Sequence, residues 1–518
     1  MRARLDSEEA ALRPRRFRHA LIVACVIALA PPTFAQTPAA SPEAAAPAPP
    51  RPIVTRHKLA LGERTLDYTA SVGTLWLADT SNTVKANITY TAYVADGVEP
   101  ARRPLTIAFN GGPGSSSAWL HVGGIGPRRI VLPEDGTAPP PPPALVDNAE
   151  SWLAFTDLVF FDPVGTGWSV PAQVDGKPVP TREFWGVTED VDWAARFIRQ
   201  YLNRANRWSS PLFLAGESYG GLRAARLAQR LPVDFAVPVA GIVMISPFLE
   251  RDLVWADRSL YPLGSALTLP SFAATAWHHG RLPGIGRDEA ARDAFLAGVE
   301  AFALTDYLST LSRGSAAPEA ERDSVFARVA AATGLPLDAV RRFDGRIPRE
   351  GFIKDGLPGR VMGRYDASIT MPDPDPGAPR SNDPDPSLTP FGAALSAAVN
   401  VQLRETLKVE RGASYVLTSG AAERGWEWRG NGGSVAQLRQ GLIANPSLRV
   451  LMVHGRFDLV TPYFATAYVA RQLRLPPELA RNVELALLDG GHMMYFHPAE
   501  RIALARRAAA FYARPAHP

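Results

Sequence analysis

The sequence predicts an α/β fold with a mostly parallel central sheet and helices on both of its faces. Short, nearly continuous apolar runs recur along the chain, as expected for strands that are covered on both sides. Amphipathic helical patterns stand between these runs, and alternation of strand and helix is typical of this class. The apolar runs are residues 105–109, 158–161, 212–215, 242–245, 448–453 and 483–488. The helical patterns are residues 190–202, 222–231, 463–473 and 499–512.

The region before the first of these runs has a different pattern. Residues 57–94 alternate between apolar and polar side chains, most clearly over residues 86–94. A period of two indicates strands with one face buried. We therefore expect antiparallel strands at the entry to the sheet.

The stretch 251–440 interrupts the alternation of strand and helix. It contains helical segments at 290–311 and 391–407, and a Pro/Asp-rich segment at 371–390 that predicts a loop. We interpret 251–440 as a mostly helical cap, inserted into a core formed by residues 54–250 and 441–518.

The first 35 residues have the features of an export signal. Four arginines between positions 13 and 18 precede an apolar run at 20–30, and Thr33-Phe34-Ala35 provides a small-residue cleavage site. The run is too short for a permanent membrane span. The protein is thus predicted to be exported, to the periplasm or the medium, by either the general or the twin-arginine route. Residues 36–53 are rich in Ala and Pro and predict a disordered linker.

Composition argues against several other classes of protein. The chain has 518 residues, 46% of them hydrophobic, and a net charge of +4 that falls to +1 without the signal. No dense basic block predicts nucleic-acid binding, and no later segment predicts a membrane span. The single cysteine, Cys25, lies in the apolar run, so no disulfides are expected; a lipid anchor at Cys25 is the alternative.

A serine in a sharp turn is the first sign of chemistry. The sequence Gly216-Glu217-Ser218-Tyr219-Gly220 lies between an apolar run and a helical pattern. This arrangement is typical of the nucleophile elbow of the α/β-hydrolase fold, where small neighbours permit a strained turn. Ser218 would sit at a helix N-terminus, which favours developing negative charge. We predict that Ser218 is a nucleophile.

A serine nucleophile requires a base and an acid, which follow it in the order Ser, Asp, His in this fold. Asp458 comes after the apolar run 448–453, and His492 comes after the run 483–488. Taken singly, Asp458 could cap a helix and His492 could be a surface-loop residue. Together with Ser218 and in the expected order, they predict a catalytic triad.

A glycine-rich loop provides a fourth element. Residues 110–117, Asn-Gly-Gly-Pro-Gly-Ser-Ser-Ser, directly follow the apolar run 105–109. The backbone N–H groups of Gly112 and Tyr219 are predicted to form an oxyanion hole. The competing interpretation is a phosphate-binding loop, but the lysine of that motif is missing. No cofactor or metal ion is expected.

Several co-linear motifs resemble those of the serine carboxypeptidases. They are Asn110-Gly111-Gly112-Pro113-Gly114-x-Ser116-Ser117, Gly126-Pro127, Asn148 with Ser151-Trp152, Asp162-Pro163-x-Gly165-Thr166-Gly167, Gly216 to Gly220, Asp458, and Gly491-His492-Met493. The resemblance covers about residues 105–495 and is weakest in the cap. It implies that Asn110 and Glu217 bind the C-terminal carboxylate of a peptide substrate, and that the cap shapes the pocket for the adjoining side chain.

The chain departs from the family pattern near the carboxylate-binding residues. Ser115 replaces a cysteine and Ala108 an aromatic residue. Gly124 stands where many members have an acidic residue. We therefore expect the carboxylate-binding network to be altered while the triad is retained.

The resulting hypothesis is an exported serine carboxypeptidase that removes C-terminal residues through an acyl-enzyme on Ser218. An esterase or acyltransferase, or another peptidase, would use the same triad on a peptide or small ester. A binding protein on a hydrolase scaffold is the alternative from a different class. The sequence has no signature of oligomeric state or of the preferred C-terminal side chain.

Overall fold

The computed structural model describes residues 49–255, 260–378, 384–428 and 432–514. The predicted signal at 1–35 and most of the linker at 36–53 lie outside these residues. The first strand, β1, begins at Ile53.

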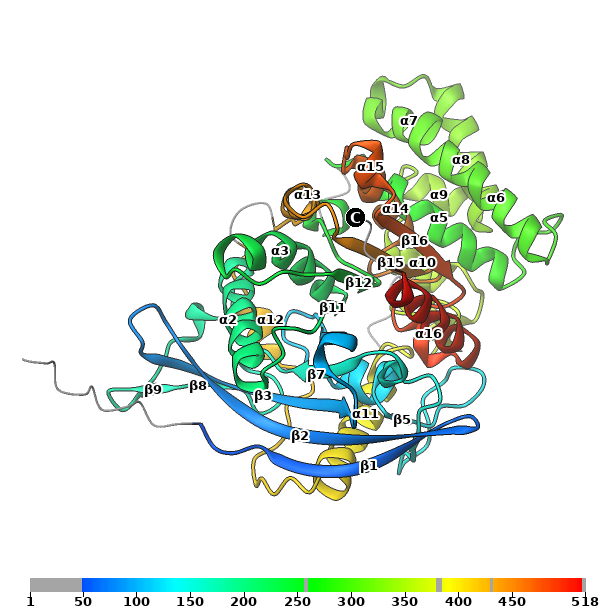
Figure 1. The fold of residues 1–518 in the computed structure, drawn as a ribbon. Helices are drawn as coiled ribbons and strands as arrows, with labels where there is room; N and C mark the ends of the chain where they lie inside the picture. Colours follow the sequence, from blue (N-terminus) through cyan, green and yellow to red (C-terminus); the bar gives the residue numbers. More distant parts are fainter. Residues whose placement is uncertain (1–48, 256–259, 379–383, 429–431, 515–518) are drawn as a thin grey trace, which may run out of the picture. The chain divides into compact units, whose positions relative to one another are not determined.

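One large sheet forms the centre of the described chain (Figure 1). Its strands lie in the order β1-β2-β3-β7-β4-β11-β12-β15-β16, and β8 pairs with β3 at one end. The bounds are β1 Ile53–Leu61, β2 Arg64–Ala78, β3 Val84–Ala95, β4 Leu105–Phe109, β7 Asp157–Phe161, β8 Val170–Pro171, β11 Leu212–Glu217, β12 Gly241–Ile245, β15 Arg449–Gly455 and β16 Val483–Leu488. Short two-stranded sheets pair β5 (Arg128–Ile130) with β6 (Leu145–Asp147), β9 (Gln173–Val174) with β10 (Lys177–Pro178), and β13 (Arg360–Met362) with β14 (Thr370–Pro372).

The direction of the strands confirms the predicted fold class. The pairs from β7 through β4, β11, β12 and β15 to β16 are parallel. The strands β1, β2 and β3 pair antiparallel, as the alternating pattern predicted, and β3 joins β7 antiparallel. A mainly parallel sheet entered through antiparallel strands is the α/β-hydrolase architecture.

Successive side chains on the central strands enter two different cores, so both faces of the sheet are covered. Ile107 and Phe109 pack on the face that holds α2 and α3, whereas Ala108 packs on the opposite face with α11 and α16. The helices of the core are α1 Ala118–Leu120, α2 Val187–Ala205, α3 Tyr219–Asp234, α14 Tyr463–Gln472, α15 Pro477–Ala480 and α16 Pro498–Ala513.

Between β12 and β15 the chain is mostly helical. The helices are α4 Arg251–Trp255, α5 Pro262–His278, α6 Glu289–Phe302, α7 Leu308–Arg313, α8 Glu319–Thr333, α9 Leu337–Arg342, α10 Arg349–Asp355, α11 Thr389–Val401, α12 Gly420–Arg424 and α13 Val435–Ala444. Helices α5 to α10 share a hydrophobic core of their own, to which α14 contributes. In contrast, α11 and α13 pack their apolar side chains into the two cores beside the sheet. No helix in the described part of the chain has the length and apolar character needed to cross a membrane.

A buried ion pair fixes α3 beneath the glycine-rich loop. Arg223 on α3 is fully buried and donates two hydrogen bonds, of 2.7 and 3.0 Å, to the carboxylate of Asp190 on α2. Its third nitrogen donates to the carbonyl oxygen of Asn110 at 2.8 Å. Its guanidinium also lies over the rings of Phe109 and Tyr219. The side chain of Arg223 thus connects α2 and α3 with Asn110, the first residue of the glycine-rich loop.

Replacement of Arg223 by methionine is expected to lower the free energy of unfolding by about 3–5 kcal/mol, because Asp190 keeps a buried charge without its partner. Urea unfolding followed by circular dichroism measures this loss. Arg230→Met on the same helix is the matched control. Its bonds to Asp192 are partly exposed, so about 0–1 kcal/mol is expected. Equal losses in the two variants would contradict the structural role of Arg223.

Candidate active site

The turn after β11 holds Ser218 in a strained conformation. Its φ and ψ angles are 59° and −124°, a combination that residues with a side chain rarely adopt. The flanking glycines are required by space, because a Cβ at position 216 would lie 2.2 Å from the carbonyl oxygen of Gly220. A Cβ at Gly220 would lie 2.9 Å from the carbonyl oxygen of Phe109. The strand, the turn and α3 occur where the motif predicted them.

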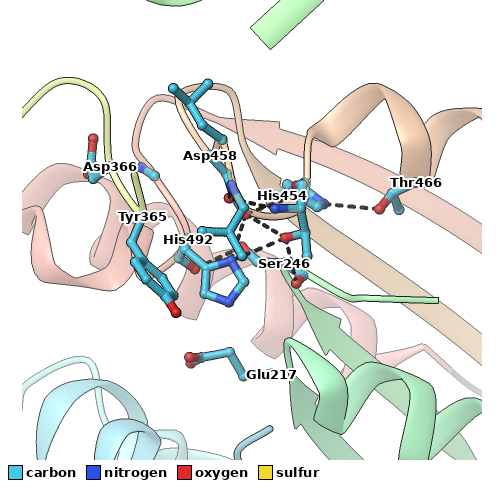
Figure 2. A network of polar contacts seen from close by, with 12 residues as sticks. Glu217, Ser246, Tyr365, Asp366, His454, Asp458, Thr466 and His492 are labelled. Carbon is cyan, nitrogen blue, oxygen red and sulfur yellow. Dashed lines mark hydrogen bonds and ion pairs between the residues drawn. The ribbon is translucent and has the colours of Figure 1, made fainter. Parts of the chain in front are cut away.

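The predicted acid and base lie in contact, although 34 residues separate them in sequence (Figure 2). His492 Nδ1 is 2.7 Å from Asp458 Oδ2, and both side chains are buried. Burial alone would raise the pKa of Asp458, but His492 and His454 hold it well below its usual range. The carboxylate is therefore ionised and accepts a hydrogen bond from the N–H at Nδ1, which leaves Nε2 of His492 as the acceptor nitrogen.

Both oxygens of Asp458 are fully engaged. Its Oδ1 accepts the backbone N–H groups of Val460 at 2.8 Å and Thr461 at 2.9 Å. Its Oδ2 accepts the hydroxyl of Thr461 at 2.6 Å in addition to His492. The loop after β15 thus fixes which oxygen faces the imidazole.

A second buried histidine lies on the other side of Asp458 and was not predicted from the sequence. His454 Nε2 is 3.3 Å from Asp458 Oδ2 and also contacts the carbonyl oxygen of Thr461. Both of these neighbours are acceptors, so Nε2 carries a proton. The hydroxyl of Thr466 lies 3.1 Å from the other ring nitrogen. This side chain therefore supplies a second donor that favours the ionised carboxylate.

The loop between β13 and β14 holds the segment that carries His492. The carbonyl oxygen of Tyr365 accepts the backbone N–H of His492 at 2.6 Å, and its ring packs edge-on against the imidazole. The carboxylate of Asp366 accepts the N–H of Gly491 at 2.9 Å and contacts His497 at 2.7 Å. A segment of the predicted cap thus orients the imidazole, which sequence reasoning missed.

Ser218, His492, Glu217 and Asn110 line one cavity of about 990 Å³. No hydrogen bond joins Ser218 to His492 within the described chain; in an enzyme without substrate such bonds are often long. In Figure 2 the imidazole lies between Glu217 and the group around Asp458. The structure therefore brings Ser218 and His492 to one cavity, and Asp458 is buried behind His492.

The glycine-rich loop approaches the elbow very closely. A Cβ at position 111 would lie only 2.4 Å from the backbone nitrogen of Tyr219. Gly112 has a φ of +100°, which favours glycine. The amide oxygen of the Asn110 side chain accepts the N–H of Leu120 at 3.0 Å, which fixes this side chain at the cavity wall. The loop and the start of α3 thus lie together at Ser218.

Glu217 is an acidic side chain held out of water. It is 4% exposed, and burial raises its pKa to about 7, against the opposing effects of His492, Tyr495 and Asn110. The hydroxyl of Tyr495 donates to its Oε2 at 2.5 Å. Near neutral pH this carboxyl can therefore gain or lose a proton inside the cavity.

The described residues contain no group of three His, Cys, Asp or Glu side chains placed to hold a metal ion. The cavity is lined by the hydroxyl of Ser218, the imidazole of His492 and the carboxyl of Glu217, together with other polar side chains that include Arg364, Asp385 and Glu423.

Fold and site together define a class: the chain has the architecture of a serine hydrolase of the α/β-hydrolase fold. Residues 78–234 match the family model for the serine carboxypeptidases, which confirms the predicted resemblance for that segment. The matched segment contains Ser218 and the glycine-rich loop, whereas Asp458 and His492 lie outside it.

Two curated proteins named as serine carboxypeptidase-like are similar to part of this chain. Serine carboxypeptidase-like 33 of Arabidopsis thaliana is 32% identical over 167 residues, which are 30% of this chain and 31% of that protein. Serine carboxypeptidase-like 2 of the same plant is 32% identical over 178 residues, 32% of this chain and 38% of that protein. The matches thus span about a third of the length of these relatives. Among solved structures, the thioesterase domain from the curacin biosynthetic pathway aligns over 85% of this chain and 98% of that chain, with a TM-score of 0.33 and 12% identity.

Proposed function

We propose that the protein is an exported serine carboxypeptidase that removes residues from the C-terminus of peptides through an acyl-enzyme on Ser218. The observation that carries the proposal is the cavity in which Ser218 and His492 stand beside Glu217, a carboxyl with a pKa near 7. A protonated carboxyl is a hydrogen-bond donor, and a free peptide C-terminus is an acceptor. The cavity therefore suits a substrate that presents a carboxylate next to the bond to be cleaved.

The reaction begins when Ser218 Oγ attacks the carbonyl carbon of the last peptide bond. Nε2 of His492 takes the hydroxyl proton and gives it to the leaving amine, while Asp458 stabilises the imidazolium. Water then attacks the ester on Ser218. Nε2 of His492 takes a proton from this water and gives it to Ser218 Oγ, which releases the acid product. The bond to Asp458 supports this role because it fixes the tautomer in which Nε2 accepts.

The oxyanion of each tetrahedral intermediate is held by the N–H groups of Gly112 and Tyr219. Tyr219 is the first residue of α3, so its N–H has no partner within the helix. The close approach of the glycine-rich loop to this nitrogen supports the pairing of the two donors. The helix N-terminus adds a favourable dipole.

The substrate carboxylate binds to Asn110 and Glu217. Two ionised carboxylates that meet in this buried site would repel each other, so one proton is shared between the substrate and Glu217. The proposal that the protein is exported rests on the predicted signal at 1–35. The segment proposed as the helical cap is 251–440.

A set of three peptides with one sequence tests the proposal. One has free ends, one is acetylated at its N-terminus, and one is amidated at its C-terminus; mass spectrometry follows the products of the mature enzyme. We expect single residues to be lost from the C-terminus of the first two and little loss from the amide. Ser218→Ala is the control. Turnover of short esters without turnover of any peptide would favour the esterase alternative, and shortening from the N-terminus would contradict the proposal.

The pH dependence of kcat/KM provides a further prediction. Burial raises the pKa of Glu217 to about 7, so carboxylate binding should be intact below that pH and lost as the pH rises through it. For peptides with a free C-terminus we expect kcat/KM to fall about tenfold per pH unit on the alkaline side. Glu217→Gln should abolish this alkaline limb, because the NH₂ group of an amide donates a hydrogen bond at every pH. A wild-type profile that continues to rise above pH 8 would contradict the role of Glu217.

A further inference from the structure

Tyr495 is a buried side chain that the proposed mechanism does not use. It lies in the single helical turn η8, Met494–Phe496, three residues after His492, and is fully buried. Its hydroxyl donates a 2.5 Å hydrogen bond to Oε2 of Glu217. Burial and the nearby Glu217 carboxyl raise the pKa of Tyr495 well above its ordinary value. The phenol therefore remains a donor throughout the working range of pH.

The position of this ring depends on a glycine. Gly124 lies in the π-helical turn η2, His121–Ile125, which packs against the ring of Tyr495. A Cβ at position 124 would lie 3.0 Å from Cδ2 and 3.1 Å from Cγ of Tyr495. The ring of Phe496 also packs edge-on against Tyr495, with the ring centres 5.1 Å apart. The phenol therefore reaches Glu217 through space that a larger residue at 124 would fill.

The direction of the hydrogen bond decides where a proton on Glu217 resides. Oε2 already accepts the phenol, so a proton on the carboxyl is placed on Oε1. The other groups that act on Glu217 are His492, Asn110 and Asp458. His492 and the hydrogen bonds of Tyr495 and Asn110 favour the ionised carboxyl, whereas burial and the charge of Asp458 oppose it.

We propose that Tyr495 is a positioning residue that sets the pH range in which Glu217 shares a proton with the substrate carboxylate. This inference rests on the proposed function. The phenol stabilises ionised Glu217 and leaves Oε1 to meet the substrate. Loss of the phenol hydroxyl removes one donor from the ionised form, so Glu217 holds its proton to higher pH.

The test compares pH profiles of kcat/KM for wild type and Tyr495→Phe. The two substrates are a peptide with a free C-terminus and an ester of the same acyl group that has no carboxylate. For the peptide, we expect the alkaline limb to move upward by about one pH unit, the size of shift that a hydrogen bond to a charged group produces. For the ester, we expect kcat/KM to stay within about twofold at every pH, because no carboxylate is bound. Glu217 and His492 interact, so the limbs are read as values of the pair.

Two variants accompany this test. Tyr463→Phe is the matched control, since Tyr463 also donates to a glutamate, Glu300, at 3.0 Å, and it should leave both profiles unchanged. Gly124→Ala keeps the hydroxyl but crowds the ring, and should move the peptide limb in the same direction as Tyr495→Phe. If Tyr495→Phe does not fold, the result for Gly124→Ala decides.

The outcomes separate this inference from the proposed function. A wild type that shows the alkaline limb, together with variants in which it does not move, would overturn the role of Tyr495 alone. An equal shift for peptide and ester would also overturn it, because the effect would then act on His492. A wild type without any preference for a free carboxylate would overturn the proposed function, and this inference with it.

Discussion

Ser218→Ala is expected to lower kcat by about 10⁵ to 10⁶-fold, because every covalent step of the proposed mechanism passes through its hydroxyl. The position of Ser218 supports this size of effect. The residue lies in a strained turn, with φ of 59°, directly before α3 and beside the glycine-rich loop. Alanine fits the same backbone and leaves the cavity intact, so KM for a peptide should change little. Single-turnover kinetics with purified protein measures the loss.

The control for Ser218→Ala is Ser312→Ala, which removes an exposed hydroxyl on α7. Its kcat should equal that of wild type. A Ser218→Ala enzyme that retains more than about a hundredth of wild-type kcat would exclude Ser218 as the nucleophile, since the remaining binding groups supply far less.

Asp458→Asn is expected to lower kcat by about 10⁴-fold with the fold intact. The N–H groups of Val460 and Thr461 both point to Oδ1, so the amide oxygen of the new side chain must take that place. The NH₂ group then faces Nδ1 of His492, and Nδ1 can only accept a hydrogen bond from it. The imidazole is forced into the tautomer that carries its proton on Nε2 and cannot accept from Ser218.

Asp338→Asn serves as the matched control, because the side chain of Asp338 on α9 is 97% exposed. It should leave kcat and the melting temperature unchanged. Near wild-type activity of Asp458→Asn in a folded protein would show that this carboxylate does not orient the base. The chemical shift of the His492 Nδ1 proton in NMR spectra provides a second readout, since the proton should be lost from that nitrogen in the variant.

Local signals in the sequence predicted the parts of the site that depend on short segments. The elbow could be predicted because strand, glycines and helix are consecutive, and the backbone of Gly216 and Gly220 leaves no space for side chains. Asp458 and His492 could be placed because each follows an apolar run that forms a strand, β15 or β16. Strand order then brings the two loops together.

The residues around the triad could not be predicted, because their contacts join distant segments. His454 is the sixth of the seven residues of β15, and a polar residue at the end of an apolar run gives no sign that it faces Asp458. Asp366 bonds to a residue 125 positions away, and the loop that carries it has no periodic pattern. Likewise, Gly124 is read from sequence as the loss of an acidic residue, whereas the structure shows the Tyr495 ring packed against it.

The helical stretch 251–440 was predicted from the loss of alternating strands, and its helices were found in the structure. No sequence pattern indicated that α11 and α13 pack on the sheet while α5 to α10 form a core of their own. All of these helices have apolar faces, and periodicity does not identify the surface against which an apolar face packs.

Covalent labelling with a fluorophosphonate tests the central claim most directly, because the reagent needs an activated serine but no particular substrate. Tryptic peptides of the labelled protein, analysed by mass spectrometry, should carry one adduct on Ser218, and His492→Ala should slow its formation by orders of magnitude. Absence of an adduct from the folded protein, or an adduct that persists in Ser218→Ala, would contradict the account.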